Sequence, residues 1–311
     1  MILGIDTSCY TTSIAFVDEE GRLLQEFRRP LTVAQGERGL RQSEGLFCHV
    51  KQLPELMEAA AACPELQGRR LAAVAVSSRP RPAAGSYMPV FLAGESLARS
   101  LAAGQQLPLY RFSHQEGHIR AALYSLGLDW PDPFIALHLS GGTGEILRVT
   151  RAGPGYAITV IGDCDLPPGQ FVDRVGQALG LPFPAGPHLD QLARTAQSRA
   201  FRLSGSVKGL RISFSGPEAA AQRAIAQGVA PAELAAAVFD NIGKSLAKAI
   251  AAARAETGLE RVLLSGGVAA SACLRHYLAR EGVCFGQPRF SGDNALGIAC
   301  LGWAAWRQDK A

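Results

Sequence analysis

The pattern of apolar and polar positions divides the chain into short buried strands and longer helices. Near the N-terminus it predicts strands at residues 2–5 and 12–17, a hairpin turn at Asp18–Gly21 and a third strand at Leu23–Arg28. A second run of three strands is predicted at Phe134–Leu139, Glu145–Val149 and Ala157–Ile161. The same strand order at two places in one chain indicates two related domains.

The rest of the chain is predicted to be mainly helical. Apolar residues at helical spacing predict helices at residues 42–62, 90–103, 115–126 and 270–280 and from 294 onward, and short apolar runs predict strands at 71–76, 109–112, 261–264 and 282–285. We expect an N-terminal domain at residues 1–112, with the final helix (about 294–311) packed back on it. The C-terminal domain then spans residues 113–311, with a helical insertion at about 163–258.

One short phrase, Ser-Gly-Gly, follows two of the predicted strands. Ser140-Gly141-Gly142-Thr143 follows the strand 134–139, and Ser265-Gly266-Gly267 follows the strand 261–264. Glycines after an apolar strand allow a turn whose backbone N–H groups face an anion. The repeated phrase suggests a duplicated domain that closes on one nucleotide.

Composition excludes several classes of protein. The 311 residues are 48% hydrophobic and 19% charged, with a net charge of +4, which permits a nucleic-acid partner without requiring one. Seven cysteines without a Cys-x-x-Cys pair favour a reduced, cytoplasmic protein. There is neither a signal-peptide pattern nor an apolar run long enough to cross a membrane.

Histidines carry the clearest chemical signal. His114 and His118, at positions i and i+4 of a predicted helix, share one helix face and can chelate one metal ion. Incidental surface histidines are the alternative, although the chain has only six. Asp293, before the final helix, is either a further ligand or a helix N-cap. His138, inside an apolar strand, is either a core residue or a fourth ligand.

Carboxylates at predicted turns are candidates for nucleotide contacts. Asp6 follows the first strand and can hold a metal–phosphate complex, or belong to an ordinary turn. Asp173 and Asp190 flank a Gly/Pro-rich turn, where they either bind ribose hydroxyls or cap helices. The loop Arg79–Pro82 carries two arginines that could contact phosphates, with a solvated loop as the equal alternative.

Taken in order, these motifs resemble the TsaD family, the tRNA threonylcarbamoyladenosine transferases, also known as glycoproteases or sialoglycoprotein endopeptidases. The resemblance covers nearly the whole chain. It rests on Leu3–Cys9, the His114/His118 helix, Leu139–Gly142, Phe171–Val175, Leu179–Asp190, Phe214–Gly216, Leu264–Ala270 and Gly292–Asn294.

The resemblance implies an α/β protein with the actin-like ATPase fold of sugar kinases, Hsp70 and actin. Two duplicated domains, each with a mixed five-stranded sheet, would close over a nucleotide. It further implies one iron or zinc ion on His114, His118 and Asp293. Archaeal and eukaryotic members of the family add a tyrosine two residues before the Ser-Gly-Gly, and His138 stands there, so we expect it to be the fourth ligand.

The implied nucleotide is ATP, ADP or an acyl-adenylate. With Asp6, its predicted contacts are Ser140, Gly141, Gly142, Thr143, Asp173, Gly186, Asp190, Gly266, Gly267 and Ser271. The implied reaction moves a threonylcarbamoyl group from an adenylate to the amine of a tRNA adenosine, without a protein nucleophile.

The chain also departs from the family pattern, as a divergent paralogue would. Acidic residues that the family has after the first strand are replaced in Cys9–Thr12, an asparagine is replaced by Ser271, and the glycine-rich loop becomes Ser78–Pro82. Carbamoyl transfer to a small molecule or protein and a non-catalytic TsaB-like partner role are therefore alternatives. A TsaB-like partner, a homodimer and a monomer all remain open, whereas peptidase activity is disfavoured because there is neither a His-Glu-x-x-His motif nor a nucleophile triad.

Overall fold

The computed structural model describes residues 1–8, 10–32 and 40–311, so Cys9 of the first motif lies outside the described residues. The chain forms two compact units. The first comprises Met1–Pro131, Thr150–Ala157 and Gly292–Ala311, and the second comprises Asp132–Val149 and Ile158–Ser291. The long first segment therefore ends after Pro131, whereas the domain boundary expected from the sequence lies after residue 112.

The first unit contains a five-stranded sheet with the order β3-β2-β1-β4-β5. Strands β1 and β2 are antiparallel, and β4 runs parallel to β1 and to β5. Its elements are β1 (Ile2–Asp6), β2 (Thr11–Val17), β3 (Leu23–Pro30), α1 (Gln42–Ala61), the 3-10 turn η1 (Pro64–Leu66), β4 (Ala73–Arg79), α2 (Phe91–Gln105), β5 (Leu109–Ser113), α3 (His114–Ser125) and α9 (Leu296–Lys310).

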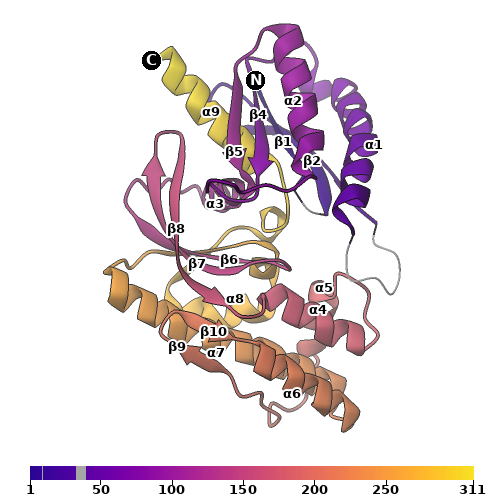
Figure 1. Ribbon diagram of the computed structural model, residues 1–311, viewed down its shortest axis with the longest axis vertical. Helices are drawn as coiled ribbons and strands as arrows, with labels where there is room; N and C mark the ends of the chain where they lie inside the picture. Colours follow the sequence, from indigo (N-terminus) through magenta and orange to yellow (C-terminus); the bar gives the residue numbers. More distant parts are fainter. Residues whose placement is uncertain (9, 33–39) are drawn as a thin grey trace. The chain divides into compact units, whose positions relative to one another are not determined.

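Helices cover both faces of this sheet, and β1 is buried along its whole length because it lies at the centre (Figure 1). Leu3 and Ile5 face the core formed with α1 and α2. Gly4 faces α9, where a Cβ atom would lie only 2.5 Å from the backbone nitrogen of Ala299. The absence of a side chain at Gly4 thus lets α9 approach the backbone of the sheet.

The second unit is built on a seven-stranded sheet with the order β12-β11-β6-β7-β8-β10-β9. Its elements are β6 (Phe134–Leu139), β7 (Gly144–Ala152), β8 (Gly155–Cys164), α4 (Pro168–Ala178), α5 (Gly186–Ala193), β9 (Ser206–Lys208), β10 (Arg211–Ser213), α6 (Ser215–Ala226), α7 (Pro231–Thr257), β11 (Val262–Ser265), η2 (Gly267–Ala270), α8 (Ala272–Leu278), η3 (Ala279–Glu281), β12 (Val283–Phe285) and η4 (Pro288–Phe290). Residues 150–157 of β7 and β8 belong to the first unit.

The prediction of five strands in each domain is correct for the first sheet and wrong for the second. The two additional strands, β9 and β10, come from the segment predicted to be a helical insertion. They form because β10 pairs in parallel with the end of β8, where Arg211 lies opposite Asp163. The remaining strands, in the order β8-β7-β6-β11-β12, repeat the order of the first sheet, which supports the predicted duplication.

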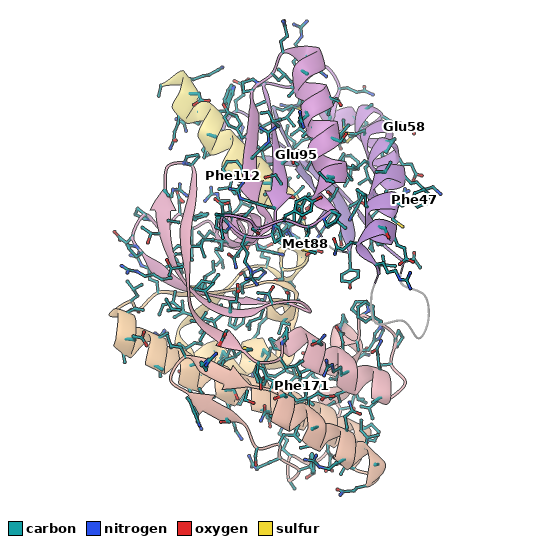
Figure 2. All side chains as sticks on the ribbon, viewed as in Figure 1. Phe47, Glu58, Met88, Glu95, Phe112 and Phe171 are labelled. Atoms are coloured by element: carbon teal, nitrogen blue, oxygen red, sulfur yellow. The ribbon has the colours of Figure 1, made fainter. Side chains whose placement is uncertain are left out.

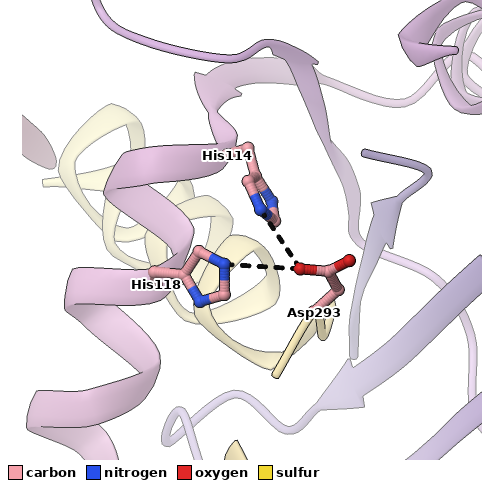
Figure 3. Close-up of side chains that lie close together, drawn as sticks. All are labelled: His114, His118 and Asp293. Atoms are coloured by element: carbon pink, nitrogen blue, oxygen red, sulfur yellow. Dashed lines mark ion pairs between the residues drawn. The ribbon is translucent and has the colours of Figure 1, made fainter. Parts of the chain in front are cut away.

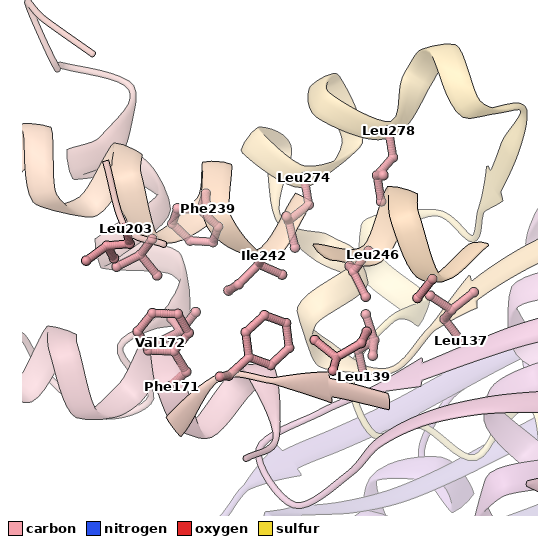
Figure 4. Packing of buried hydrophobic residues seen from close by; sticks show 14 of the residues in the cluster. Leu137, Leu139, Phe171, Val172, Leu203, Phe239, Ile242, Leu246, Leu274 and Leu278 are labelled. Carbon is pink, nitrogen blue, oxygen red and sulfur yellow. The ribbon is translucent and has the colours of Figure 1, made fainter. Parts of the chain in front are cut away.

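The core of the second unit gathers around α7. Phe239, Ile242 and Leu246 of this helix pack with Leu139 of β6 and Leu274 of α8, among other residues (Figure 4). The apolar face of α7 is long because the helix runs from Pro231 to Thr257.

Aromatic side chains differ in burial between elements. Phe112 of β5 and Phe171 of α4 are buried, whereas Phe47 on α1 is exposed (Figure 2). Among the described residues, no helix has the length and apolar character required to span a membrane.

Candidate metal centre and glycine loops

In the first unit, the beginning of α3 places two histidines on one face of that helix. Ser113 is the N-cap of α3, and its hydroxyl accepts a hydrogen bond from the backbone N–H of Glu116. The Glu116 carboxylate accepts hydrogen bonds in return from the backbone N–H and hydroxyl of Ser113. His114 is therefore the first residue of the helix, and His118 follows one turn later. Glu116 therefore caps the helix, which explains why the glutamate stands two residues after the first histidine and not directly after it, as in the His-Glu-x-x-His motif of metalloproteases.

Asp293 lies beside both histidines, just before α9 (Figure 3). Its Oδ1 atom is 3.5 Å from Nε2 of His114 and 3.5 Å from Nε2 of His118. Its Oδ2 atom accepts a hydrogen bond from the backbone N–H of Tyr10 at 3.3 Å. The N-cap of α9 is Ala295, so Asp293 does not cap that helix.

Close packing of α3 against α9 brings these three residues together. A Cβ atom at Gly297 of α9 would overlap the carbonyl oxygen of Gly117 in α3, and a Cβ atom at Gly117 would lie 2.9 Å from the side chain of Ile298. The start of α9 is also fixed by a 2.8 Å hydrogen bond from the backbone N–H of Ala295 to the hydroxyl of Ser13. The glycines thus allow an approach that larger residues would prevent.

The donor set suits a metal ion. One ligand atom from each of His114, His118 and Asp293 lies within 4.8 Å of the others, and no other group of this kind occurs among the described residues. Two imidazole nitrogens and one carboxylate oxygen fit zinc or ferrous iron, and three protein ligands are typical of catalytic sites with an open position. The residues therefore fit the predicted ion.

The electrostatics of the cluster also favour a cation. Burial by itself would lower the pKa of His114, but the carboxylates of Asp6 and Asp293 raise this pKa to about 10. Burial and the nearby His114 lower the pKa of His118. For Asp293, burial acts in the opposite direction, yet the hydrogen bonds from the two histidines hold the pKa well below its usual range. The two carboxylates thus create a negative electrostatic potential that favours a positively charged group or ion at this position.

His138 lies on β6, in the second unit, and is buried. It is paired with Ser265 of β11 on one side and with Glu145 of β7 on the other. Its role as a fourth ligand stays a prediction.

Both Ser-Gly-Gly loops belong to the second unit. Ser140–Thr143 forms the turn of the β6–β7 hairpin, and the Ser140 hydroxyl accepts hydrogen bonds from the backbone N–H groups of Gly142 and Thr143. Gly266 follows β11 with a φ of 89°, and a Cβ atom there would overlap the carbonyl oxygen of Leu139. The two loops therefore lie next to each other, at the ends of the parallel strands β6 and β11.

Two of the glycines border open space. A Cβ atom at Gly142 or Gly267 would meet no other part of the described chain within 4 Å, and both residues are exposed. Asp173 of α4 faces the first loop, with its Oδ2 atom 3.9 Å from where a Cβ atom of Gly141 would stand. Burial raises the pKa of Asp173, while a hydrogen bond from the backbone N–H of Ala185 opposes this effect. This open surface is compatible with a bound nucleotide.

Asp190 and Ser271 are in direct contact. Asp190 is buried in α5, and its Oδ1 atom accepts hydrogen bonds from the Ser271 hydroxyl and the backbone N–H of Cys273. It therefore holds the N-terminus of α8, which agrees with the helix-cap interpretation and leaves its predicted nucleotide contact untested. Gly186 is the first residue of α5.

Some residues that shape these regions were missed by the sequence analysis. Asp165, at the end of β8, accepts hydrogen bonds from the hydroxyls of Ser213 and Ser215 and from the backbone N–H of Phe214. Ser77, near the end of β4, donates to Asp6. Neither pairing has a local sequence signal, because each joins strands that are far apart in the chain.

Comparisons with known proteins identify the fold. The activator of 2-hydroxyisocaproyl-CoA dehydratase from Clostridium difficile, solved with bound ADPNP, matches 99% of this chain with a TM-score of 0.58 and 12% identity, over 96% of its own length. This likeness shows the fold alone, and it confirms the predicted actin-like ATPase fold.

Sequence comparisons identify the family. The TsaD model, described as tRNA N6-adenosine threonylcarbamoyltransferase, matches residues 47–300. The enzyme of that name from Thermus thermophilus is 31% identical over 99% of this chain and 93% of its own length. A probable bifunctional tRNA threonylcarbamoyladenosine biosynthesis protein from Methanothermobacter thermautotrophicus is also 31% identical, over 99% of this chain and 56% of its own length. This chain therefore belongs to the TsaD family.

Proposed function

We propose that this chain transfers a threonylcarbamoyl group from its adenylate to the N6 amine of an adenosine in tRNA. The observation that carries the proposal is the cluster of His114, His118 and Asp293 in a chain that is similar, over nearly its full length, to tRNA N6-adenosine threonylcarbamoyltransferases. The reaction forms a bond from the amine nitrogen to the carbamoyl carbon. It breaks the bond from that carbon to the phosphate oxygen, so AMP leaves with the electron pair and the amine loses a proton.

In this proposal His114, His118 and Asp293 hold one iron or zinc ion. A bound ion of this kind would act as a Lewis acid toward the carbonyl or phosphate oxygens of the adenylate. The protein residues contribute rigidity, because Asp293 is also bound to the backbone of Tyr10 and His114 to Asp6. His138 stays a predicted fourth ligand.

The glycine loops of the second unit are the proposed site for the adenylate. Gly142 and Gly267 leave space at the loop surfaces, and Asp173 lies beside Gly141. A side chain at either exposed glycine would fill volume that a phosphate or nucleoside needs. The predicted contacts of Asp190 and Ser271 with a nucleotide belong to the same proposal, as do a partner subunit and a cytoplasmic location.

A transfer assay tests the function directly. Metal-loaded protein is mixed with threonylcarbamoyl-adenylate and unmodified tRNA, and the digested nucleosides are quantified by mass spectrometry. We expect modified adenosine to form. We expect Asp293→Ala, which removes a proposed metal ligand, to reduce its rate of formation by about 100-fold or more, which corresponds to a loss of about 2.7 kcal/mol of transition-state stabilisation.

The matched control is His276→Ala, which removes an exposed histidine of the second unit that belongs to no metal-ligand cluster. Its rate should equal that of the unaltered chain. If metal-loaded protein that binds the adenylate forms no modified adenosine, or if Asp293→Ala retains full activity, the proposed function is wrong.

A further inference from the structure

Asp6 is fully buried at the end of β1, and both of its carboxylate oxygens are occupied. Oδ2 accepts a hydrogen bond from the hydroxyl of Ser8 at 2.9 Å. Oδ1 accepts one from the hydroxyl of Ser77 and lies 3.2 Å from Nδ1 of His114. No surface of Asp6 is left for solvent or for a phosphate-bound cation.

We propose that Asp6 is a positioning residue of the metal centre, and this inference rests on the proposed function. The carboxylate accepts the Nδ1 proton of His114, so the lone pair of Nε2 points toward Asp293. A ligand histidine that donates its other N–H to a carboxylate is fixed in one tautomer and one ring orientation, and it is a more basic ligand. This role replaces the contact with a metal–phosphate complex that the sequence suggests for Asp6.

The geometry of the His114 ring supports this assignment. The ring lies between two carboxylates, with Nδ1 facing Asp6 and Nε2 facing Asp293 at 3.5 Å. The second histidine, His118, faces Asp293 through its own Nε2 atom. Because both Nε2 atoms converge on Asp293, the orientation of His114 decides whether the three ligands can share one ion.

Sheet register explains how Asp6 is held. Strands β1 and β4 are parallel, with Ile5 opposite Val76, so the residues that follow, Asp6 and Ser77, lie side by side. The pairing of β1 with β4 thus brings the Ser77 hydroxyl to the buried Asp6 carboxylate. A buried carboxylate needs such hydrogen-bond donors to offset the hydration that it loses.

The next residue fixes the turn. The hydroxyl of Thr7 donates to the carbonyl oxygen of Val90 at 3.0 Å and accepts a hydrogen bond from the backbone N–H of Gly94 at 3.1 Å. These bonds attach the turn after β1 to α2 and to Val90, the N-cap residue of that helix. Asp6 is therefore a rigid support for His114.

The decisive measurement is the tautomer of His114 in the zinc-loaded, unaltered chain. Long-range proton–nitrogen NMR of 15N-labelled imidazoles distinguishes a proton on Nδ1 from one on Nε2. We expect the proton on Nδ1 and zinc on Nε2. A proton on Nε2 would overturn the proposal, whether or not any variant folds.

Asp6→Asn measures the strength of the effect. The amide has the same size, but it can donate to Nδ1 and thereby favour the wrong tautomer. We expect zinc affinity, measured by competition with a chromophoric chelator, to fall about 10–100-fold, the range typical of residues that support metal ligands. Ser77→Ala, which removes one donor to Asp6, should cause a smaller loss.

Asp18→Asn is the matched control, because Asp18 is another buried aspartate of the first unit, bonded to Arg22 and not to the metal ligands. Its zinc affinity should be unchanged, and unfolding midpoints in chelator report the folding of each variant. If folded Asp6→Asn protein binds zinc as tightly as the unaltered chain, Asp6 has no positioning role. If the unaltered chain itself binds no zinc, the metal centre fails, and the inference fails with it.

Discussion

The corresponding ends of two parallel strands in the repeated sheet carry opposite chemistry in the two units. In the first unit, the C-terminal ends of β1 and β4 supply Asp6 and Ser77, which are buried and hydrogen-bonded to each other. In the second unit, the equivalent loops after β6 and β11 supply Ser140–Thr143 and Gly266–Gly267. The space between the ends of β1 and β4 is filled by a carboxylate and a hydroxyl, whereas the loops after β6 and β11 have exposed glycines that leave space beside them.

This comparison changes the meaning of the repeated Ser-Gly-Gly phrase. The two copies are not equivalent elements of a duplicated domain, because both lie in the second sheet, after the adjacent strands β6 and β11. The duplication is real in the strand order, but its counterparts in the first unit are Asp6-Thr7-Ser8 and Ser77. Topology provides the position of a loop, and side chains decide whether that loop favours a cation or an anion.

If the two regions are independent, variants of the glycine loops should lose nucleotide affinity without losing zinc affinity, and variants of the metal centre should do the reverse. The largest effect is expected for Gly266→Ala, because this residue has a φ of 89° and its Cβ atom would overlap the carbonyl oxygen of Leu139. We expect the free energy of unfolding to fall by about 3 kcal/mol, from backbone strain and overlap together. Chemical denaturation measures it.

Gly267→Ala is the matched control for that variant, since its Cβ atom would point into open space. It should retain stability within about 0.5 kcal/mol while its affinity for an adenine nucleotide falls. Nucleotide binding that is unaffected in Gly267→Ala would contradict the proposed adenylate site.

A second, intermediate effect is expected for Gly297→Ala in the first unit. The added methyl group would separate α9 from Gly117 of α3 and so move Asp293 away from the histidines. We expect a loss of about 2 kcal/mol of stability together with weaker zinc binding, but unchanged nucleotide affinity. Calorimetry with zinc and with nucleotide measures both affinities.

Gly104→Ala tests whether the effect depends on position. Gly104 lies within α2, where a Cβ atom would meet no other part of the described chain, so alanine should stabilise the protein by about 0.5–1 kcal/mol. Equal zinc affinity in Gly297→Ala and Gly104→Ala would show that the close approach of α3 and α9 does not position the metal ligands.

The smallest effect is expected for Asp165→Asn, which weakens the hydrogen bonds at the start of α6. Burial acts to raise the pKa of Asp165, but the bonds from Ser215, Ser213 and Phe214 prevail and lower it. The carboxylate therefore stabilises the fold above the ordinary pKa near 3.8, and this contribution is lost as the pH falls through the lower folded-state pKa.

Because solvent screens the exposed Asp165 carboxylate, we expect the asparagine variant to be at most about 1 kcal/mol less stable at pH 7, with the difference shrinking below about pH 4. Urea denaturation at several pH values measures the difference. Asp163→Asn is the control, because its ion pair with Arg211 is exposed and should contribute little. A difference for Asp165→Asn that persists at low pH would rule out the carboxylate as its source.

The sequence by itself determined the elements and part of the metal centre. Apolar runs predict most strands because buried strands need them, and the four-residue spacing of His114 and His118 places both on one helix face regardless of the rest of the fold. The motifs indicated Asp293 and the family. The short strands β9 and β10 were missed, since each has three residues and forms by pairing at a sheet edge.

Only the tertiary structure decided how these parts work together. Asp6 and His114 are 108 residues apart, and Asp6 and Ser77 are 71 residues apart, so no local pattern could relate them. Their contacts depend on strand register in the first sheet and on the close packing of α3 against α9. Spacing along the chain specifies which side chains share an element, whereas the choice of neighbours across elements depends on the packing of the whole unit.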